Sequence, residues 1–410
     1  MRGVDPRLFG IKKFGVKKSP KPYLDNIEIT FEFLSDNFLE TFIYSQIFNV
    51  RSFNNMDYLK FLTDVDDELS KEFVDRKLYT RYLCDSYSRC SSRGFDTAKI
   101  NYFDRYSSVS SCSRFLDFGL TLGGEHKLCK ANFCRDKFCP MCAWRRARKM
   151  YNQVYTCVDA VKSDYQFLFL TLTVPNVCGS ELSDTINLLN KSFRAFVRYK
   201  FLDNIVVGYV KCLEITYNRK RDDYHPHLHV LLVVPLDYFV SDNYISRDSF
   251  LLEWRRATNN YNITQVDVRK VRNNPNRPEL SNIASAVAEV TKYAIKPTDY
   301  IFTDSKLLTD RILYTLSNVL YGRRTISFGG IFIKLRRQLG YTKDINDDDD
   351  LIHIDNKASD DIVSVSRYVW YNGRYHLYAV QTPDDSPNQY VVPCSDSDFA
   401  VDLDTGEILI

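Results

Sequence analysis

The sequence lacks long hydrophobic runs. It has no apolar stretch of about 18 residues and no amino-terminal signal peptide, so we expect a cytoplasmic protein without a membrane partner. It also lacks internal repeats and a GxxxxGKS/T phosphate loop, which argues against a fused helicase. Its 11 cysteines are odd in number and clustered, a pattern that favours thiols and bound metal over disulfides. Histidine is scarce, and three of the six fall within residues 225–229.

Charge is small overall but unevenly placed along the chain. The first 343 residues carry 52 basic and 37 acidic side chains, whereas residues 344–410 carry 3 basic and 15 acidic ones. The basic body indicates a polyanion partner, and the acidic end indicates a solvated or self-shielding tail. Aromatic residues make up 14% of the chain and could stack single-stranded bases, although most must be core.

Residues 224–234 (YHPHLHVLLVV) have the pattern of a half-buried strand. Because side chains alternate along a strand, His225, His227 and His229 share one face and the apolar residues fill the other. Positions two apart lie roughly 6.5 Å apart, a span that two imidazoles can close onto one cation. The alternative is a set of satisfied core histidines.

The preceding strand-like segment, residues 206–217, carries Glu214 and is joined to the histidine strand by a polar loop, which predicts a hairpin. A carboxylate beside two histidines gives a mixed site suited to Mg²⁺ or Mn²⁺. Direct pairing of Tyr217 with His225 would turn Glu214 to the wrong face. We therefore predict a one-residue offset or a bulge that sets it beside His227 or His229. A strand-edge charge is the alternative role of Glu214.

A helical pattern follows in AEVTKYAIKPTDY, where Glu289 and Tyr293 stand four apart on one flank of an apolar stripe. A phenol attacks well only if its proton is withdrawn or its target is made more electrophilic, so Glu289 is a candidate base. Lys292 and Lys296 would meet phosphate charge. Tyr300 is the rival nucleophile, and a structural role is the default for any one of 28 tyrosines.

A cysteine-rich segment, LCKANFCRDKFCPMCAWRRARK, precedes these elements. Its cysteines are separated by four, four and two residues, which predicts a structural Zn²⁺ held by Cys129, Cys134, Cys139 and Cys142. Free buried thiols are the alternative. The basic run after the last cysteine begins a helix on which Arg145 and Arg146 would contact DNA phosphate or simply be solvated.

Three motifs in order, FLTLTVPN, HPHLHV and E-x-x-K-Y, resemble those of rolling-circle replication initiators of small plasmids and viruses, within the HUH endonuclease superfamily. The match covers roughly residues 129–300. The resemblance implies that His227 and His229 hold a divalent metal. It also implies that Tyr293 cuts one DNA strand, keeps the 5′ phosphate as a phosphotyrosine and releases a 3′ hydroxyl. The Glu289 position resembles the single-tyrosine plasmid branch, in which this carboxylate activates water.

The expected fold is α+β, with a central antiparallel sheet of ferredoxin-like or RRM-like βαββαβ layout between residues 166 and 303. The resemblance implies the same architecture. The expected organisation is a basic flexible arm (1–22), an N-terminal region (23–120), a Cys-rich zinc-like segment with a basic helix (121–162), the nicking domain (163–303), a C-terminal extension of the basic body (304–343) and an acidic tail with a possible β-hairpin (344–410).

We therefore expect a metal-dependent DNA nicking-joining endonuclease that acts on single-stranded or hairpin origin DNA alongside a host helicase and DNA polymerase. Three alternatives remain. A transposase or relaxase of the same superfamily would use the same chemistry on another DNA. An RRM-like binder would share the sheet without cutting. A zinc-structured transcription regulator would bind duplex DNA.

Overall fold

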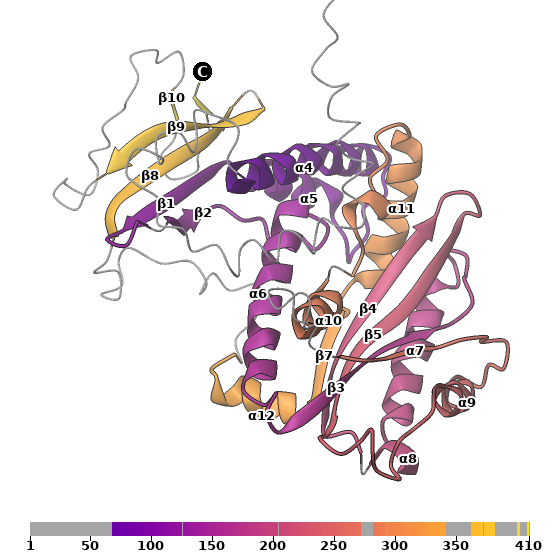
Figure 1. Cartoon of the computed structure of the whole chain (residues 1–410). Helices are drawn as coiled ribbons and strands as arrows, with labels where there is room; N and C mark the ends of the chain where they lie inside the picture. Colours follow the sequence, from indigo (N-terminus) through magenta and orange to yellow (C-terminus); the bar gives the residue numbers. More distant parts are fainter. Residues whose placement is uncertain are drawn as a thin grey trace, which may run out of the picture. The chain divides into compact units, whose positions relative to one another are not determined.

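The computed structural model describes residues 68–124, 126–203, 205–271, 282–292, 294–341, 362–371, 373–381, 400–401 and 408–409. All of them belong to one contact unit, Asn49–Ile410. They form helices and antiparallel sheets, so the expected α+β class is confirmed (Figure 1). The expected basic arm, residues 1–22, lies outside the described residues. None of the helices in the part of the chain that the structure describes has the length and hydropathy of a membrane span.

A five-stranded antiparallel sheet has the strand order β6-β3-β5-β4-β7. Its strands are β3 (Tyr165–Thr173), β4 (Gly208–Asn218), β5 (Asp223–Pro235), β6 (Asp267–Lys270) and β7 (Ile326–Gly330). The first four arise in the predicted βαββαβ order, and β5 pairs with both β3 and β4, as in ferredoxin-like folds. β7 extends this sheet at the β4 edge.

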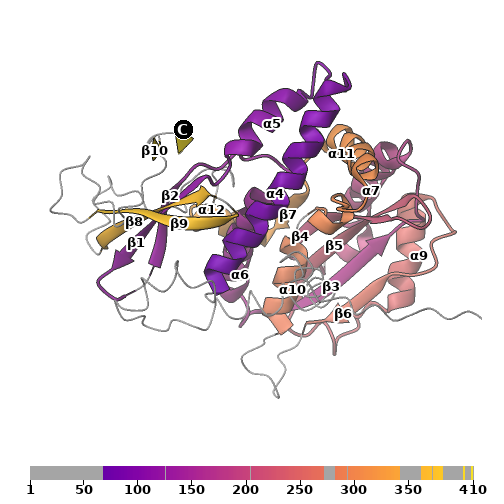
Figure 2. The same ribbon diagram turned by 90° about the horizontal axis from the view of Figure 1, so that it is seen from above.

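Helices cover both faces of this sheet (Figures 1 and 2). On one face lie α7 (Leu182–Phe196) and α9 (Arg247–Thr258). The short helix α8 (Lys200–Asp203) follows α7 along the chain. The predicted apolar stripe of α7 is buried: Leu182, Ile186, Leu189, Phe193 and Phe196. On the other face lies α10 (Asn282–Thr291), with Val287 and Val290 fully buried.

Side chains along β4 show how the two faces divide. Tyr209 and Lys211 point to α7, where the Tyr209 ring meets Phe193 edge-on and Lys211 donates a hydrogen bond to Asn190 Oδ1 at 2.5 Å. Glu214, an odd number of residues from both, therefore points to the opposite face, which α10 covers.

The remaining helical elements fall outside the βαββαβ segment of the chain. They are α4 (Glu68–Ser92), α5 (Tyr102–Ser111), α6 (Pro140–Asp159), the 3₁₀ turn η1 (Pro297–Asp299), α11 (Lys306–Leu320) and α12 (Ile331–Gln338). Helix α6 contacts α4, α10 and α12, so it links the amino-terminal helices to the covered face of the sheet (Figure 2).

A second sheet has the order β2-β1-β8-β9 and joins segments that are distant in the chain. It consists of β1 (Phe115–Thr121), β2 (His126–Ala131), β8 (Ile362–Tyr371) and β9 (Arg374–Gln381); two short strands, β10 (Ala400–Val401) and β11 (Ile408–Leu409), pair separately. The β-hairpin expected within residues 344–410 is present as β8 and β9, with Gly373 at a φ of 82° in its turn. Composition did not predict that β8 pairs with β1.

Candidate metal centre and active site

The register of the β4–β5 hairpin sets the functional side chains. Tyr217 pairs with Tyr224, so Glu214 lies directly opposite His227, and Cys212 lies opposite His229. The predicted one-residue offset is thus confirmed, and it occurs without a bulge along β4. On the other side of β5, Thr171 lies opposite His229.

The three predicted metal ligands converge on one point. His227 Nε2 lies 3.1 Å from His229 Nε2, and Glu214 Oε2 lies 2.8 Å from His229 Nε2 and 3.4 Å from His227 Nε2. Neighbouring ligands of a cation with bonds of about 2.1 Å are separated by about 3 Å, so this spacing fits Mg²⁺ or Mn²⁺. All three side chains are buried.

The outer nitrogens of both rings are engaged by fixed partners. His227 Nδ1 lies 3.1 Å from the carbonyl oxygen of His225, which can only accept, so the proton of the neutral ring is on Nδ1. His229 Nδ1 lies 3.2 Å from Thr171 Oγ1. The Thr171 hydroxyl can accept a hydrogen bond from His229 Nδ1 in the same way. With both Nδ1 atoms protonated, each Nε2 presents a lone pair to the shared point, beside a carboxylate oxygen. Three acceptors facing one another repel unless a cation or proton lies between them.

Electrostatics favour an ionised Glu214. Burial alone would raise the pKa of this carboxyl group. When no cation is bound and the Nε2 atoms of His227 and His229 carry protons, their hydrogen bonds and charge outweigh burial and lower the pKa below its usual value. The residues thus form a nitrogen and oxygen donor set with its negative charge already in place, which is what a hard divalent cation requires.

Two charged side chains lie at the edge of this centre: Glu289 on α10, and Lys292 directly after that helix. Glu289 Oε1 is 3.6 Å from His229 Nε2, and its other oxygen forms an ion pair with Lys292. Further along the chain, burial raises the pKa of Asp299 to about 6, and the positive charge of Lys296 only partly opposes this rise. The structure therefore places Glu289 beside His229.

Tyr293 lies outside the described residues. Its neighbours in the chain contact β4 on both sides of Glu214: the carbonyl of Lys292 accepts from Cys212 Sγ at 3.8 Å, and that of Ala294 accepts from the backbone amide of Ile215 at 2.8 Å. Helix α10 ends at Thr291, whereas the helical pattern predicted a helix that continues through Ala294 toward Pro297.

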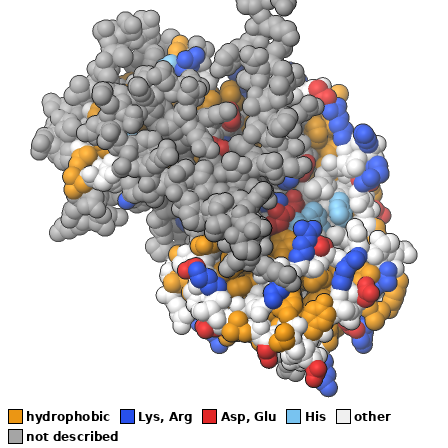
Figure 3. Space-filling model, in the orientation of Figure 1, with side chains coloured by type: hydrophobic (Ala, Val, Ile, Leu, Met, Phe, Trp, Pro, Cys, Tyr) orange, Lys and Arg blue, Asp and Glu red, His pale blue; other side chains and the backbone are white. Residues whose placement is uncertain are grey.

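The rival nucleophile, Tyr300, is not at the centre. It is 1% exposed, and its hydroxyl donates a 2.6 Å hydrogen bond to the carbonyl of Phe138, whose ring it meets edge-on. A phenol held in this way packs the fold and is not oriented for attack on a bound strand. At the surface, histidine and acidic atoms meet over the region of β4 and β5 (Figure 3).

Comparisons with known proteins identify a matching family. The family described as Replication protein matches residues 125–378. The chain belongs to this family. The resemblance to plasmid rolling-circle Rep proteins is thereby confirmed. No solved structure matches the chain significantly.

Curated relatives share a large part of their length with the chain. A "Protein rep" of Staphylococcus aureus is 43% identical over 204 residues, which is 49% of this chain and 86% of the relative. Proteins of the same name from Streptococcus pneumoniae (36% over 257 residues, 58% of this chain and 77% of the relative) and Bacillus amyloliquefaciens (34% over 253 residues, 58% and 74%) are also similar.

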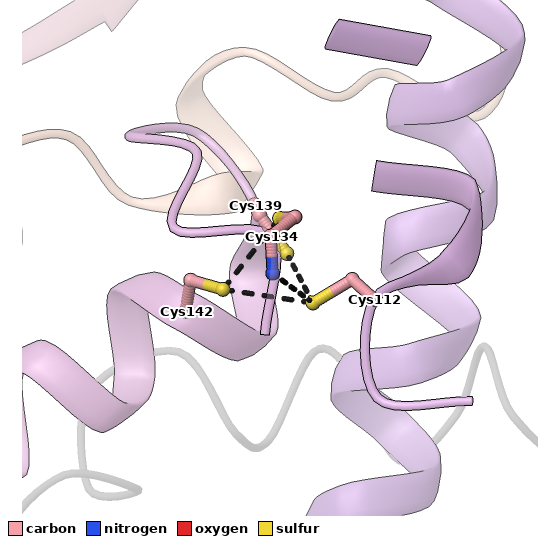
Figure 4. Close-up of side chains that lie close together, drawn as sticks. All are labelled: Cys112, Cys134, Cys139 and Cys142. Carbon is pink, nitrogen blue, oxygen red and sulfur yellow. Dashed lines mark hydrogen bonds between the residues drawn. The ribbon is translucent and has the colours of Figure 1, made fainter. Parts of the chain in front are cut away.

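The cysteines of this replication protein are arranged differently from the prediction. Cys134, Cys139 and Cys142 cluster as expected, but the fourth member is Cys112 and not Cys129 (Figure 4). Cys129 lies on β2, where its sulfur faces Gly119 of the neighbouring strand. Because β2 pairs with β1, the Cys129 side chain is held on that sheet and away from the cluster.

The two predicted DNA-contacting arginines have neighbours within the protein. Arg146 donates to the backbone carbonyls of Arg135, Asp136 and Lys137 at 2.9–3.2 Å. The Arg145 guanidinium lies 4.5 Å from the centre of the Phe133 ring. Both arginines thus support the loop before α6, and their contact with DNA stays a prediction.

Sequence reasoning missed two residues, Thr171 and Cys112. Thr171 could have been found, because it is a polar residue of the predicted FLTLTVPN strand, which a ferredoxin-like layout pairs with the histidine strand. Cys112 offered no local signal: it precedes a strand, and 21 residues separate it from Cys134.

Proposed function

We propose that this protein initiates rolling-circle replication by cutting one strand of origin DNA. The observation that carries the proposal is the convergence of His227 Nε2, His229 Nε2 and a Glu214 oxygen within 3.4 Å of one another. Family membership supports a role in replication, and the donor set supports a phosphoryl-transfer centre.

Mg²⁺ or Mn²⁺ bound by His227, His229 and Glu214 would polarise a phosphoryl oxygen of the scissile bond. The protein's own part is to keep both rings in one tautomer, through the His225 carbonyl and Thr171, and to hold the carboxylate ionised. The sheet face beside these groups would receive single-stranded or hairpin origin DNA, and Lys292 and Lys296 would contact its phosphates.

In the proposed cutting step, Tyr293 Oη forms a bond to phosphorus as the bond to the 3′ oxygen breaks. The phenol loses its proton, and the departing oxygen gains one to become a 3′ hydroxyl. A phosphodiester is exchanged for another, so the protein can later rejoin the strand. The contacts of Lys292 and Ala294 with β4 on either side of Glu214 support this role for Tyr293.

Glu289 is proposed as the base that activates water to release the bound strand at the end of replication. Its place 3.6 Å from His229 Nε2 supports a role at the centre. In Glu289→Gln, cutting should continue while the covalent adduct accumulates, because hydrolysis of the phosphotyrosine is slowed. A host helicase and a DNA polymerase would act on the opened origin.

The test is incubation of the full chain with Mn²⁺ and a labelled single-stranded oligonucleotide library, followed by mass spectrometry of any peptide that carries a nucleotide. We expect the nucleotide on Tyr293. Tyr293→Phe should form no adduct and keep its DNA affinity, whereas the matched control Tyr300→Phe should still form it, because that hydroxyl is buried against Phe138.

An adduct in Tyr293→Phe, or a nucleotide on another residue of the wild type, would contradict the assignment. The absence of any cut in supercoiled DNA that carries a functional origin would instead favour a non-enzymatic binder. Origin and substrate assays separate an initiator from a transposase or relaxase with the same chemistry.

A further inference from the structure

The cysteine cluster has the dimensions of a tetrahedral metal site. The Sγ atoms of Cys112, Cys134, Cys139 and Cys142 all lie within 4.8 Å of one another (Figure 4). Cys112 is 3.5 Å from Cys142 and 3.6 Å from Cys139, and Cys134 is 3.6 Å from Cys142. Four sulfurs bound to Zn²⁺ at about 2.3 Å are separated by about 3.8 Å, whereas a disulfide requires about 2 Å.

The backbone around the cluster directs amide groups at the sulfurs. The amide of Arg135 donates to Cys142 Sγ at 3.3 Å, and that of Cys134 donates to Cys112 Sγ at 3.5 Å. Arg135 has a φ of 59°, a left-handed conformation that residues other than glycine rarely adopt. In this conformation the amide of Arg135 faces the sulfur of Cys142. Such bonds stabilise thiolates and orient metal ligands.

The helix that follows also favours negative charge at this position. Cys139 is the N-cap of α6, and Cys142 lies in its first turn. Unpaired amides and the helix dipole make a helix amino terminus favourable for thiolates. A lysine adds to this field: Lys77 of α4 is 7% exposed and donates to the backbone carbonyl of Cys112. A buried ammonium is favourable beside four thiolates and one Zn²⁺, which together carry two negative charges.

We propose that Cys112, Cys134, Cys139 and Cys142 bind one structural Zn²⁺, with Cys112 in place of Cys129 as the fourth ligand. Each thiol releases its proton to solvent on binding. All four donors are sulfur, and Cys112, Cys139 and Cys142 are buried, so the site is closed and has no position for substrate.

The metal would fasten together elements that local sequence leaves apart. Cys112 follows α5 and precedes β1, whereas the other ligands belong to the loop before α6 and to α6 itself. That loop is a junction for several elements. Asp136 accepts from Arg105 of α5 at 2.7 Å and from Tyr87 of α4 at 3.1 Å, and Phe138 accepts from Tyr300.

The loop that carries the cysteines is connected to the five-stranded sheet through Tyr300. Tyr300 directly follows η1, which contacts β4. Zinc at the four cysteines would therefore hold the loop that receives Tyr300, and with it the chain between α10 and α11. The proposal stands independently of strand cutting, because zinc content and thiol protection are measured without DNA.

The test compares the full-length wild type with Cys112→Ser and Cys129→Ser, each purified with zinc present and analysed for bound metal. We expect about one Zn²⁺ per chain in the wild type and in Cys129→Ser. In Cys112→Ser, the bound zinc per chain should fall by at least roughly tenfold. Cys129→Ser is the matched control because Cys129 is also buried and is excluded from the cluster. Replacement by Co²⁺ should give the intense thiolate charge-transfer and visible bands of a four-sulfur tetrahedral site.

Wild-type protein gives a second measurement that needs no folded variant. In alkylation followed by mass spectrometry, Cys112 should be protected with zinc and should become reactive, together with Cys134, after zinc is stripped. Zinc lost from Cys129→Ser and kept by Cys112→Ser would overturn the proposal. A wild type without zinc, or with a disulfide among these four cysteines, would overturn it as well.

Discussion

The orientation of His229 depends on a hydroxyl from the neighbouring strand. Thr171 Oγ1 is 3.2 Å from Nδ1, and this contact keeps Nε2 aimed at Glu214 and His227. His227 uses a different partner, the carbonyl of its own strand at His225. The two rings are therefore held separately, and one support can be removed while the other is kept.

Thr171→Val should weaken Mn²⁺ binding by roughly 10–100-fold, because valine cannot form the hydrogen bond that holds His229 Nδ1. The fold should be retained, since the two side chains have nearly the same shape. Isothermal titration with Mn²⁺ measures the change. Thr173→Val is the control: Thr173 lies opposite His227, whose Nδ1 is bound to the His225 carbonyl, so its affinity should stay within about twofold of wild type. Equal affinity in Thr171→Val and wild type would refute the supporting role.

Asp299 predicts a pH dependence of stability. Its Oδ2 is buried without a hydrogen-bond partner among the described residues, and burial raises its pKa to about 6. Between the usual value near 4 and this value, the folded state binds more protons than the unfolded chain, so stability falls as pH rises through about 4 to 6.

Asp299→Asn should remove this fall. The difference in free energy of unfolding, variant minus wild type, should rise by on the order of 2 kcal/mol from about pH 4 to pH 7. Urea denaturation without divalent metal measures this difference. Asp304→Asn is the control, because that side chain is 60% exposed. A constant difference between Asp299→Asn and wild type across this range would show that Asp299 titrates normally.

At the scale of elements, the turn from β7 into α12 requires glycine. Gly330 has a φ of 58°, and an added Cβ would lie 2.1 Å from the carbonyl oxygen of Val207 and 2.7 Å from Gly208 Cα. Both contacts are with backbone, which cannot move aside without disturbing the β4–β7 pairing. Gly322 shares the positive φ, at 65°, but has open space around it.

Gly330→Ala should therefore lower the free energy of unfolding by at least about 3 kcal/mol, since strain and overlap add. Gly322→Ala should lower it by only about 1 kcal/mol, from backbone strain alone. Urea denaturation of both variants gives the difference. Equal losses would mean that β7 can shift away from β4 at low cost.

Elements encoded by local periodicity could be predicted from sequence. The alternating histidines of β5 and the apolar stripe of α7 gave elements within a few residues of those observed, and the Glu214 register followed from the requirement that it face the histidines. The end of α10 was less predictable, because its last turn is replaced by contacts of the following chain with β4. Such contacts come from another element and leave no local pattern.

The cysteine cluster shows the same limit within the site. Spacing alone favoured Cys129, the nearest cysteine in the chain. Strand pairing between β1 and β2 decides the matter, since it turns the Cys129 sulfur to Gly119 and leaves the end of α5 to supply Cys112.

At the scale of the whole molecule, a strand from the acidic end of the chain pairs with β1, about 250 residues earlier in the sequence. β8 lies between β1 and β9, and Arg367 of β8 forms a two-pronged ion pair with Asp117 of β1 at 2.8 Å, both side chains at most 5% exposed. Neither charge run nor periodicity predicts a partner 250 residues away. The acidic composition of residues 344–410 pointed to solvent, whereas the described strands are part of a sheet.

Arg367→Ala should lower the free energy of unfolding by about 3–5 kcal/mol, because it leaves the Asp117 carboxylate buried without its main cation. The double variant Asp117→Leu/Arg367→Met should recover most of this loss, since two apolar side chains leave no buried charge. Thermal and urea denaturation of the full chain provide both values. A double variant as unstable as Arg367→Ala would show that packing, and not charge, accounts for the loss.

The claim that His227, His229 and Glu214 form one metal centre is tested most directly by pulsed electron paramagnetic resonance of bound Mn²⁺. The wild-type spectrum should show nitrogen couplings from two histidines, reduced to one in His227→Ala and in His229→Ala. Wild-type couplings in both variants would place the metal elsewhere and contradict the account.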